Sequence, residues 1–123
     1  MGAWNYPLFT AICPAANGIA AGNCVIIKPS ELTPNTSKLL RELFEKYMDP
    51  QCYKVIYGGV EVAKKITTIP FDLITFTGSG EKGKLVAKAA AENLTPVILE
   101  LGGKSPTIID EDACIDNAGL RIT

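Results

Sequence analysis

The sequence has no histidine among its 123 residues. Without an imidazole, Ser–His–Asp and Cys–His nucleophile arrangements and histidine-ligated metals are excluded for this chain. Its four cysteines form no Cys-x-x-Cys motif, so neither a zinc ribbon nor a thioredoxin-type site is indicated. These cysteines are Cys13, Cys24, Cys52 and Cys114. Any chemistry must therefore use carboxylate, thiol, amide or backbone groups, and we expect no metal site.

An excess of charge and long apolar runs are also lacking. Twelve Lys and Arg balance thirteen Asp and Glu, which leaves a formal net charge of −1 and no basic surface typical of nucleic-acid binding. No apolar stretch approaches the roughly 18 residues needed to span a bilayer. Residues 1–7 lack the basic-then-apolar layout of a signal peptide. We expect no nucleic-acid partner, no membrane contact in this segment and a cytoplasmic location.

Short β-rich runs alternate with helical patterns along the chain. The expected strands are 24–28, 53–57, 72–77 and 97–101, with 107–110 as a candidate fifth. The expected helices are 8–21, 34–48, 60–67 and 81–92. Start and stop residues support them: Thr33 and Pro34 suit a helix start, and Gly22 suits a helix end. This alternation predicts an α/β fold, an open parallel sheet with helices on both faces.

Glycine and charge gather where the expected strands end. The segments are 28–31, 58–59, 77–83 and 100–104, and together they are called the carboxyl edge below. In an open parallel sheet ligands bind at this edge, where backbone N–H groups and helix N-termini attract phosphate. A single such loop is equally well explained as a tight turn, but four on one edge favour ligand binding.

Residues 78–83 also fit the G-x-G-x-x-G pattern, with Glu100 as a candidate ribose-binding acid. The dinucleotide fingerprint follows the first strand of its unit, whereas this run follows the third. The standard assignment therefore stays open.

Four blocks carry a family resemblance. They are Gly-Ala-Trp-Asn-Tyr-Pro at 2–7, Gly-Asn-Cys-Val-Ile-Ile-Lys-Pro-Ser-Glu at 22–31, Phe-Thr-Gly-Ser at 76–79 and Leu-Glu-Leu-Gly-Gly-Lys-Ser-Pro at 99–106. In order and spacing they resemble the signature blocks of the aldehyde dehydrogenase superfamily. The first two blocks and the turn at 58–60 resemble its class 3 branch, whose members oxidise fatty and aromatic aldehydes with NAD or NADP. The resemblance implies a Rossmann-like cofactor domain.

The resemblance implies a role for several residues. Asn5 matches an asparagine whose amide stabilises the oxyanion formed when a thiolate adds to the aldehyde. Glu100 matches the general base that directs water onto the resulting thioester. Lys28 and Glu31 match a pair that contacts the adenine ribose of the cofactor.

The remaining matches concern the cofactor's other parts. Gly78 and Ser79 match the turn that meets the pyrophosphate, and Gly102 lies where backbone approaches the nicotinamide. Two positions depart from the family's pattern: Gly80 stands where threonine is more usual, and Lys82 where an aliphatic residue often packs near the cofactor. Lys82 could instead offer its charge to a phosphate.

None of the four cysteines has the glycine-glutamine-x-cysteine context of the family's nucleophile, which is expected beyond position 123. We therefore interpret residues 1–123 as part of a cofactor-binding domain, without the catalytic and oligomerisation parts, and expect this chain alone to be inactive. The whole protein is expected to be a homodimer that acts on a small-molecule aldehyde substrate. The alternative is a non-catalytic nucleotide-binding or dimerisation module. A Rossmann reductase is less favoured, because no tyrosine–lysine donor pair is found.

Overall fold

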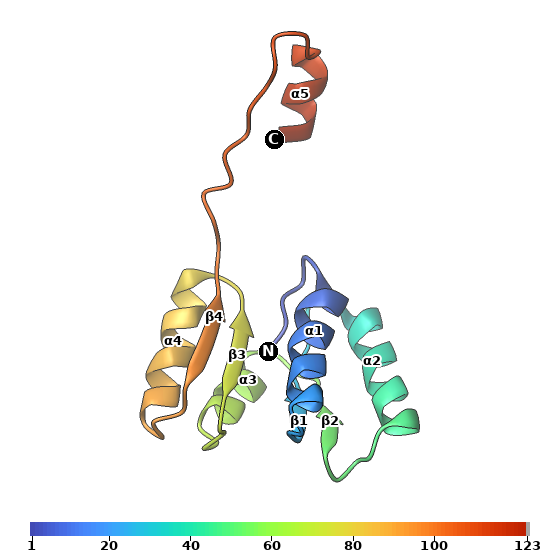
Figure 1. Ribbon diagram of the computed structural model, residues 1–123, viewed down its shortest axis with the longest axis vertical. Coiled ribbons are helices and arrows are strands. Elements are labelled where there is room, and N and C mark those ends of the chain that lie inside the picture. Colours follow the sequence, from blue (N-terminus) through green and yellow to red (C-terminus); the bar gives the residue numbers. More distant parts are fainter. Residues whose placement is uncertain (123) are drawn as a thin grey trace.

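The computed structural model describes residues 1–122, in which helices and strands alternate (Figure 1). The helices are α1 (Pro7–Ala20), α2 (Pro34–Tyr47), α3 (Val60–Thr67), α4 (Gly80–Ala91) and α5 (Ile115–Ile122). The strands are β1 (Val25–Ile27), β2 (Tyr53–Val55), β3 (Ile74–Thr77) and β4 (Val97–Glu100). The four predicted helices and four main predicted strands are confirmed, although the strands are shorter than expected.

The strands form two parallel pairs, β1 with β2 and β3 with β4. Met1 and Gly2 join these pairs. The amide of Gly2 donates to the carbonyl of Lys28 at 3.0 Å. The amino group of Met1 donates to the carbonyl of Thr75 at 2.7 Å, and the amide of Thr77 donates to the carbonyl of Met1 at 3.1 Å. The order across the molecule is therefore β2, β1, residues 1–2, β3, β4.

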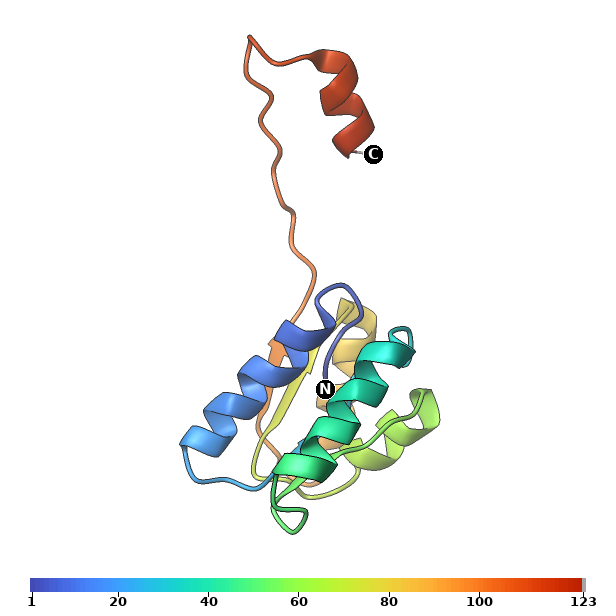
Figure 2. The same cartoon turned by 90° about the vertical axis from the view of Figure 1, so that its right-hand side faces the viewer.

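The expected α/β class with parallel strands is confirmed, and the four strands divide into two pairs rather than forming one ladder. Only two residues lie between the facing edges of β1 and β3, too few to form a ladder with either strand. Figures 1 and 2 show helices on both sides of the strands. The helix α1 contacts β1 and α2, whereas α4 contacts α3, β3 and β4. Each strand pair therefore has its own helical cover.

Two small hydrophobic cores follow from this arrangement. The first lies between α1, α2 and β1, and its buried members are Ala11, Ala15, Ile27 and Leu40. The second lies between β3 and α4, and its buried members are Ile74, Phe76, Val86 and Ala90. Alanines on the helices let them approach the strands closely, while the larger side chains come mostly from the strands. Ile27 is the last residue of β1 and Phe76 the last but one of β3, so each core holds a strand end that leads to the carboxyl edge.

Local sequence signals explain most element boundaries. Gly22 has a φ of +81°, a conformation that favours glycine, and it follows Ala21, the C-cap of α1. Thr33 and Pro34 begin α2 as predicted, but Thr33 makes no side-chain cap; its hydroxyl donates to the carbonyl of Ser30 at 3.3 Å. Ser79 does cap α4, since its hydroxyl oxygen accepts the amide of Lys82 at 3.4 Å.

Residues 101–114 extend away from the body and carry α5 at their end (Figure 1). The predicted fifth strand at 107–110 is wrong, because no strand lies beside this segment to complete its hydrogen bonds. Ile108 is 93% exposed there. The helix α5 was not predicted, and within the described residues it has no buried side chain.

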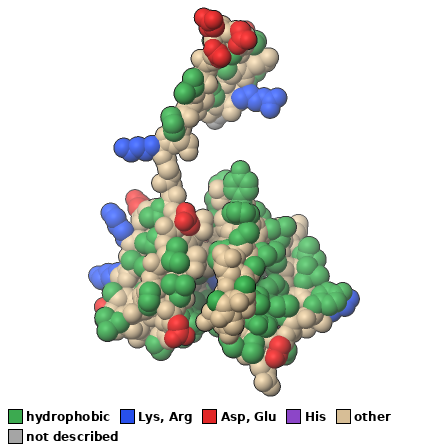
Figure 3. Space-filling view, in the orientation of Figure 1, with side chains coloured by type: hydrophobic (Ala, Val, Ile, Leu, Met, Phe, Trp, Pro, Cys, Tyr) green, Lys and Arg blue, Asp and Glu red, His purple; other side chains and the backbone are tan. Residues whose placement is uncertain are grey.

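Much apolar surface remains uncovered. Figure 3 shows hydrophobic side chains spread over the half of the molecule that contains α1 and α2. The exposed apolar residues of these helices include Phe9 in α1 and Leu39 and Leu43 in α2, with exposed fractions of 68%, 50% and 43%. Exposed apolar surface of this kind is typical of contacts with protein, membrane or ligand. None of the helices in residues 1–122 is both long and apolar enough to cross a membrane.

Candidate functional site

An ion pair lies at the carboxyl end of β1. The Nζ of Lys28 donates to Oε2 of Glu31 at 2.8 Å, and the two side chains are 7% and 35% exposed. The hydrogen bond from Lys28 lowers the pKa of Glu31, and the charge of Lys82 acts in the same direction. The carboxylate is therefore ionised at neutral pH. An ammonium group has three donors, so the bond to Glu31 leaves Lys28 able to donate to a ligand hydroxyl.

The turn after β1 holds this pair in place. The hydroxyl of Ser37, a fully buried residue in the first turn of α2, donates to the carbonyl of Ser30 at 2.8 Å. The amide of Leu32 donates to the hydroxyl oxygen of Ser30 at 3.2 Å. Lys28 and Glu31 thus project from a turn that is fixed from both ends.

Gly78 and Ser79 form the turn between β3 and α4. The amide of Gly78 donates to the carbonyl of Glu100 at 3.0 Å. A Cβ at position 78 would lie 2.6 Å from Cζ of the buried Phe76, so the local packing itself requires glycine. Ser79 caps α4, and the first-turn amides of a helix attract anions. The chemistry of this turn fits a phosphate group.

Glu100 ends β4, and the strand register pairs it with Thr77. Its backbone therefore lies beside the Gly78–Ser79 turn, as the sequence predicted for residues of one edge. Its carboxylate is exposed to solvent in this structure. The two strand ends bring a carboxylate and a candidate phosphate-binding turn to one place.

Asn5 lies in the bend before α1 and is exposed. The bend is fixed by Thr10, whose hydroxyl oxygen accepts the amide of Ala3 at 3.0 Å and whose hydroxyl lies 3.0 Å from the carbonyl of Tyr6. No hydrogen bond within residues 1–122 joins the Asn5 side chain to Glu100. The structure positions the backbone of Asn5 and leaves its amide free to meet a ligand.

Gly102 is exposed, and a Cβ built there would have no atom within 4 Å. Packing within this chain therefore gives no reason for a glycine at 102. Gly83 differs, because its Cβ would lie 2.7 Å from Cδ2 of Leu101. The last glycine of the G-x-G-x-x-G pattern thus lets α4 approach the segment after β4, a packing role that the motif alone did not reveal.

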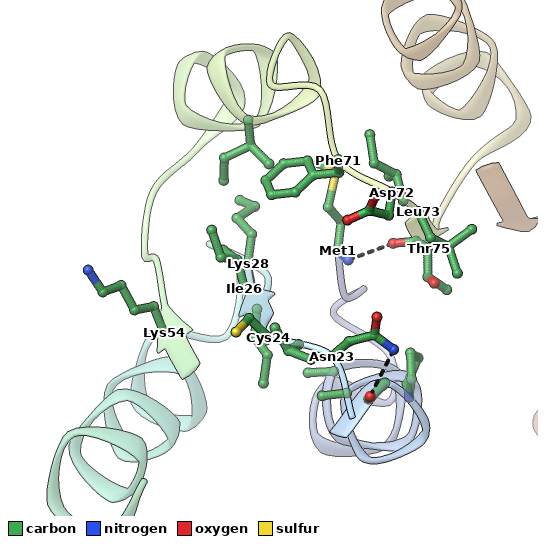
Figure 4. A pocket seen from close by; sticks show the side chains of 18 of the residues that line it. Met1, Asn23, Cys24, Ile26, Lys28, Lys54, Phe71, Asp72, Leu73 and Thr75 are labelled. Carbon is green, nitrogen blue, oxygen red and sulfur yellow. Dashed lines mark hydrogen bonds between the residues drawn. The ribbon is translucent and has the colours of Figure 1, made fainter. Parts of the chain in front are cut away.

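A cavity of about 680 Å³ lies between the two strand pairs, and of the carboxyl edge only Lys28 lines it (Figure 4). Met1, Ile26, Lys28 and Thr75 are among the residues that line it. The amino group of Met1 is largely buried here, and this burial, with the nearby charge of Lys28, lowers its pKa to about 6. No sequence signal indicated this buried amine, because it depends on the two strand pairs lying side by side.

The buried amine predicts that stability depends on pH. Between pH 6 and 8 the unfolded amino terminus, with a pKa of 8.0, holds a proton that the folded one, with a pKa of about 6, has released. Because the unfolded state binds more protons, the free energy of unfolding of the 123-residue chain should rise by about 2 kcal/mol between pH 6 and pH 8. Urea unfolding at pH 6 and pH 8 measures the change. Acetylation of Met1 should abolish it, and an undiminished rise in the acetylated chain would contradict the assignment.

The parallel strand pairs, their helical cover and the polar carboxyl edge define a Rossmann-like α/β unit. The aldehyde dehydrogenase family model matches residues 1–122, so the chain belongs to the aldehyde dehydrogenase family. Over 123 residues it is 50% identical to aldehyde dehydrogenase family 3 member A2 of Rattus norvegicus, a match that covers all of this chain and 25% of that protein.

Two solved structures support the assignment. A substrate-bound AldH of Staphylococcus aureus has a TM-score of 0.84 and 49% identity, over 97% of this chain and 26% of that one. An aldehyde dehydrogenase of Mycobacterium tuberculosis in complex with NAD+ has a TM-score of 0.76 and 43% identity. The match covers 84% of this chain and 22% of that one. The chain spans about a quarter of the length of the relatives it matches. The expected family, and with it the class 3 resemblance, is confirmed.

Proposed function

We propose that this chain is part of the cofactor-binding domain of an NAD(P)+-dependent aldehyde dehydrogenase, which oxidises aldehydes to carboxylic acids through a cysteine thioester. The bound nicotinamide cofactor would accept hydride from the substrate. Lys28 and Glu31 bind the adenine ribose, the Gly78–Ser79 turn meets the pyrophosphate, and the backbone at Gly102 approaches the nicotinamide. The observation that carries the proposal is the ion pair between the buried Lys28 and the partly exposed Glu31 at the carboxyl end of β1, in a member of this family.

The charges of the site fit a ribose. A sheltered ammonium donates to hydroxyls, and a carboxylate that stays ionised accepts from them. The negative charge of Glu31 repels a 2′-phosphate, whereas the positive charge of Lys82 attracts one. Lys82 also acts on Glu31 through its charge. The site is therefore compatible with NAD or NADP. An M. tuberculosis relative was crystallised with NAD+, which supports the same cofactor here.

Substrate chemistry is proposed for Asn5 and Glu100. The amide of Asn5 donates to the oxyanion, and the Glu100 carboxylate takes a proton from the attacking water. The nucleophilic cysteine comes from another part of the enzyme, because Cys24 and Cys52 precede β1 and β2 and so lie at the opposite edge. We expect the 123-residue chain alone to show no dehydrogenase turnover. The complete enzyme is proposed to be a cytoplasmic homodimer that acts on a small-molecule aldehyde substrate.

Titration of the chain with NAD+ tests the ribose site. We expect saturable binding that weakens about tenfold or more in Glu31→Gln, because a charge-assisted hydrogen bond contributes about 1.5–3 kcal/mol. Lys28→Met should weaken binding similarly. Glu42→Gln and Lys38→Met are matched controls, since these residues form an exposed pair on α2. Equal binding by all four variants, or no binding at millimolar NAD+, would contradict the proposed site.

A further inference from the structure

Two cysteines outside the carboxyl edge lie side by side. Cys24 directly precedes β1 and Cys52 directly precedes β2. The parallel register pairs Val25 with Tyr53, the residues that follow the two cysteines. The amide of Val25 donates to the carbonyl of Cys52 at 2.8 Å, which fixes the two chains beside each other at this point. Cys24 and Cys52 therefore lie opposite each other, each one residue before the first paired residues of β1 and β2.

Their side chains share one face of the pair. Val25 and Val55 pack against the core under α1 and α2, and alternate residues of a strand point to opposite faces. Cys24 and Cys52 therefore point away from this core, as Ile26 does. Both cysteines line the cavity between the strand pairs, and Figure 4 shows Cys24 with Ile26 and Lys54 at its wall.

The geometry suits a disulfide. Neighbouring strands lie about 4.7–4.9 Å apart, within the range of Cα separations that a disulfide spans. The neighbouring Cys24 thiol, together with desolvation, raises the pKa of Cys52. The turn before β2 holds Cys52 further, since its amide donates to the carbonyl of Asp49 at 3.1 Å. Both thiols are free, Cys24 exposed and Cys52 partly buried.

We infer that Cys24 and Cys52 form a dithiol modification site that small disulfides such as glutathione disulfide oxidise to an intramolecular disulfide. The thiolate of the exposed Cys24 attacks one sulfur of the small disulfide, forms a mixed disulfide and releases one thiolate. The Cys52 thiolate then attacks the Cys24 sulfur and releases the second. Two protein thiols lose two electrons, the small disulfide is reduced to two thiols, and the two cysteine protons pass to the released thiolates.

The site lies at the amino ends of β1 and β2, at the opposite edge from Lys28 and the turn at 78–79. It is thus separate from the proposed cofactor site. Cys13 and Cys114 provide controls, because one lies within α1 and the other just before α5, and both are exposed. The double variant Cys13→Ser/Cys114→Ser isolates the pair in an otherwise unchanged chain.

The test treats this double variant with excess glutathione disulfide and measures its intact mass. We expect a monomer lighter by two hydrogen atoms. After cleavage at Lys38 and Arg41, the peptides that contain Cys24 and Cys52 should remain linked until reduction. Adding Cys24→Ser or Cys52→Ser should instead give a stable adduct with one glutathione.

The same treatment in urea separates the folded geometry from chance reactivity. In urea, glutathione adducts should replace the intramolecular disulfide. Circular dichroism verifies that the untreated variants are folded in buffer. Glutathione adducts without linked peptides in the folded double variant would overturn the inference. A disulfide-linked dimer, or an equal yield of the intramolecular link in urea, would also overturn it.

Discussion

Replacing Glu100 with glutamine should stop turnover after a single round of hydride transfer. The appropriate host is the S. aureus AldH, in which this chain replaces the matching segment, because the two share 49% identity and a TM-score of 0.84 over it. Without the carboxylate, water is not activated and the thioester persists. Steady-state kcat should fall by about 10²–10⁴-fold, the usual contribution of a general base.

Pre-steady-state kinetics distinguishes this role from a structural one. We expect a burst of about one NADH per active site followed by almost no further formation, and an acyl adduct visible by intact mass. Glu92→Gln is the matched control, since Glu92 is an exposed carboxylate just after α4, away from the carboxyl edge. If Glu100→Gln turned over like the parent, or lost the burst as well, Glu100 would not be the base.

Replacing Asn5 with alanine should slow the addition of the thiolate to the aldehyde, the step before hydride transfer. An oxyanion donor acts only once the thiolate has added, so the variant should lose kcat/KM while binding NAD+ normally. Loss of one such donor costs about 2.7–4 kcal/mol, or about 10²–10³-fold. Unlike the Glu100 variant, this one should show a slow burst or none, because formation of the acyl-enzyme is itself impaired.

Two further variants make the Asn5 test specific. Asn5→Asp keeps the shape but removes the amide donor and adds charge, so it should be at least as impaired as alanine. Asn35→Ala changes an exposed asparagine in the first turn of α2 and should leave the rate unchanged. Near-parental rates in both Asn5 variants would contradict the oxyanion role and leave Asn5 only a structural role in the bend before α1.

Much of the fold could be predicted because its signals are local. The apolar stripe of α2, Pro34 at its start and Gly22 after α1 each act within a few residues, and the structure has the elements where these residues put them. The break between the strand pairs could not be predicted. The break depends on which strand edges face each other across Met1 and Gly2, and the periodicity of a sequence does not predict which strands become neighbours.

The candidate site divides in the same way. The sequence predicted that residues 28 and 100 lie at the ends of strands and that residues 31 and 78 follow strands, and parallel pairing brings the ends of β3 and β4 together. It did not predict that the Lys28 side chain is sheltered, because its burial depends on non-local packing. The cysteine pair was equally hidden: only the β1–β2 register makes partners of Cys24 and Cys52.

The most direct test of the central claim is reduction of NAD+ by the S. aureus AldH that carries this chain in place of its matching segment. The chain's own Asn5, Lys28, Glu31, Gly78 and Glu100 would then supply the proposed contacts. We predict a folded enzyme that binds NAD+ and oxidises an aldehyde substrate of its host, with a Kd for NAD+ within about tenfold of the host's. A folded chimera that binds no NAD+ would show that this segment does not form a cofactor site.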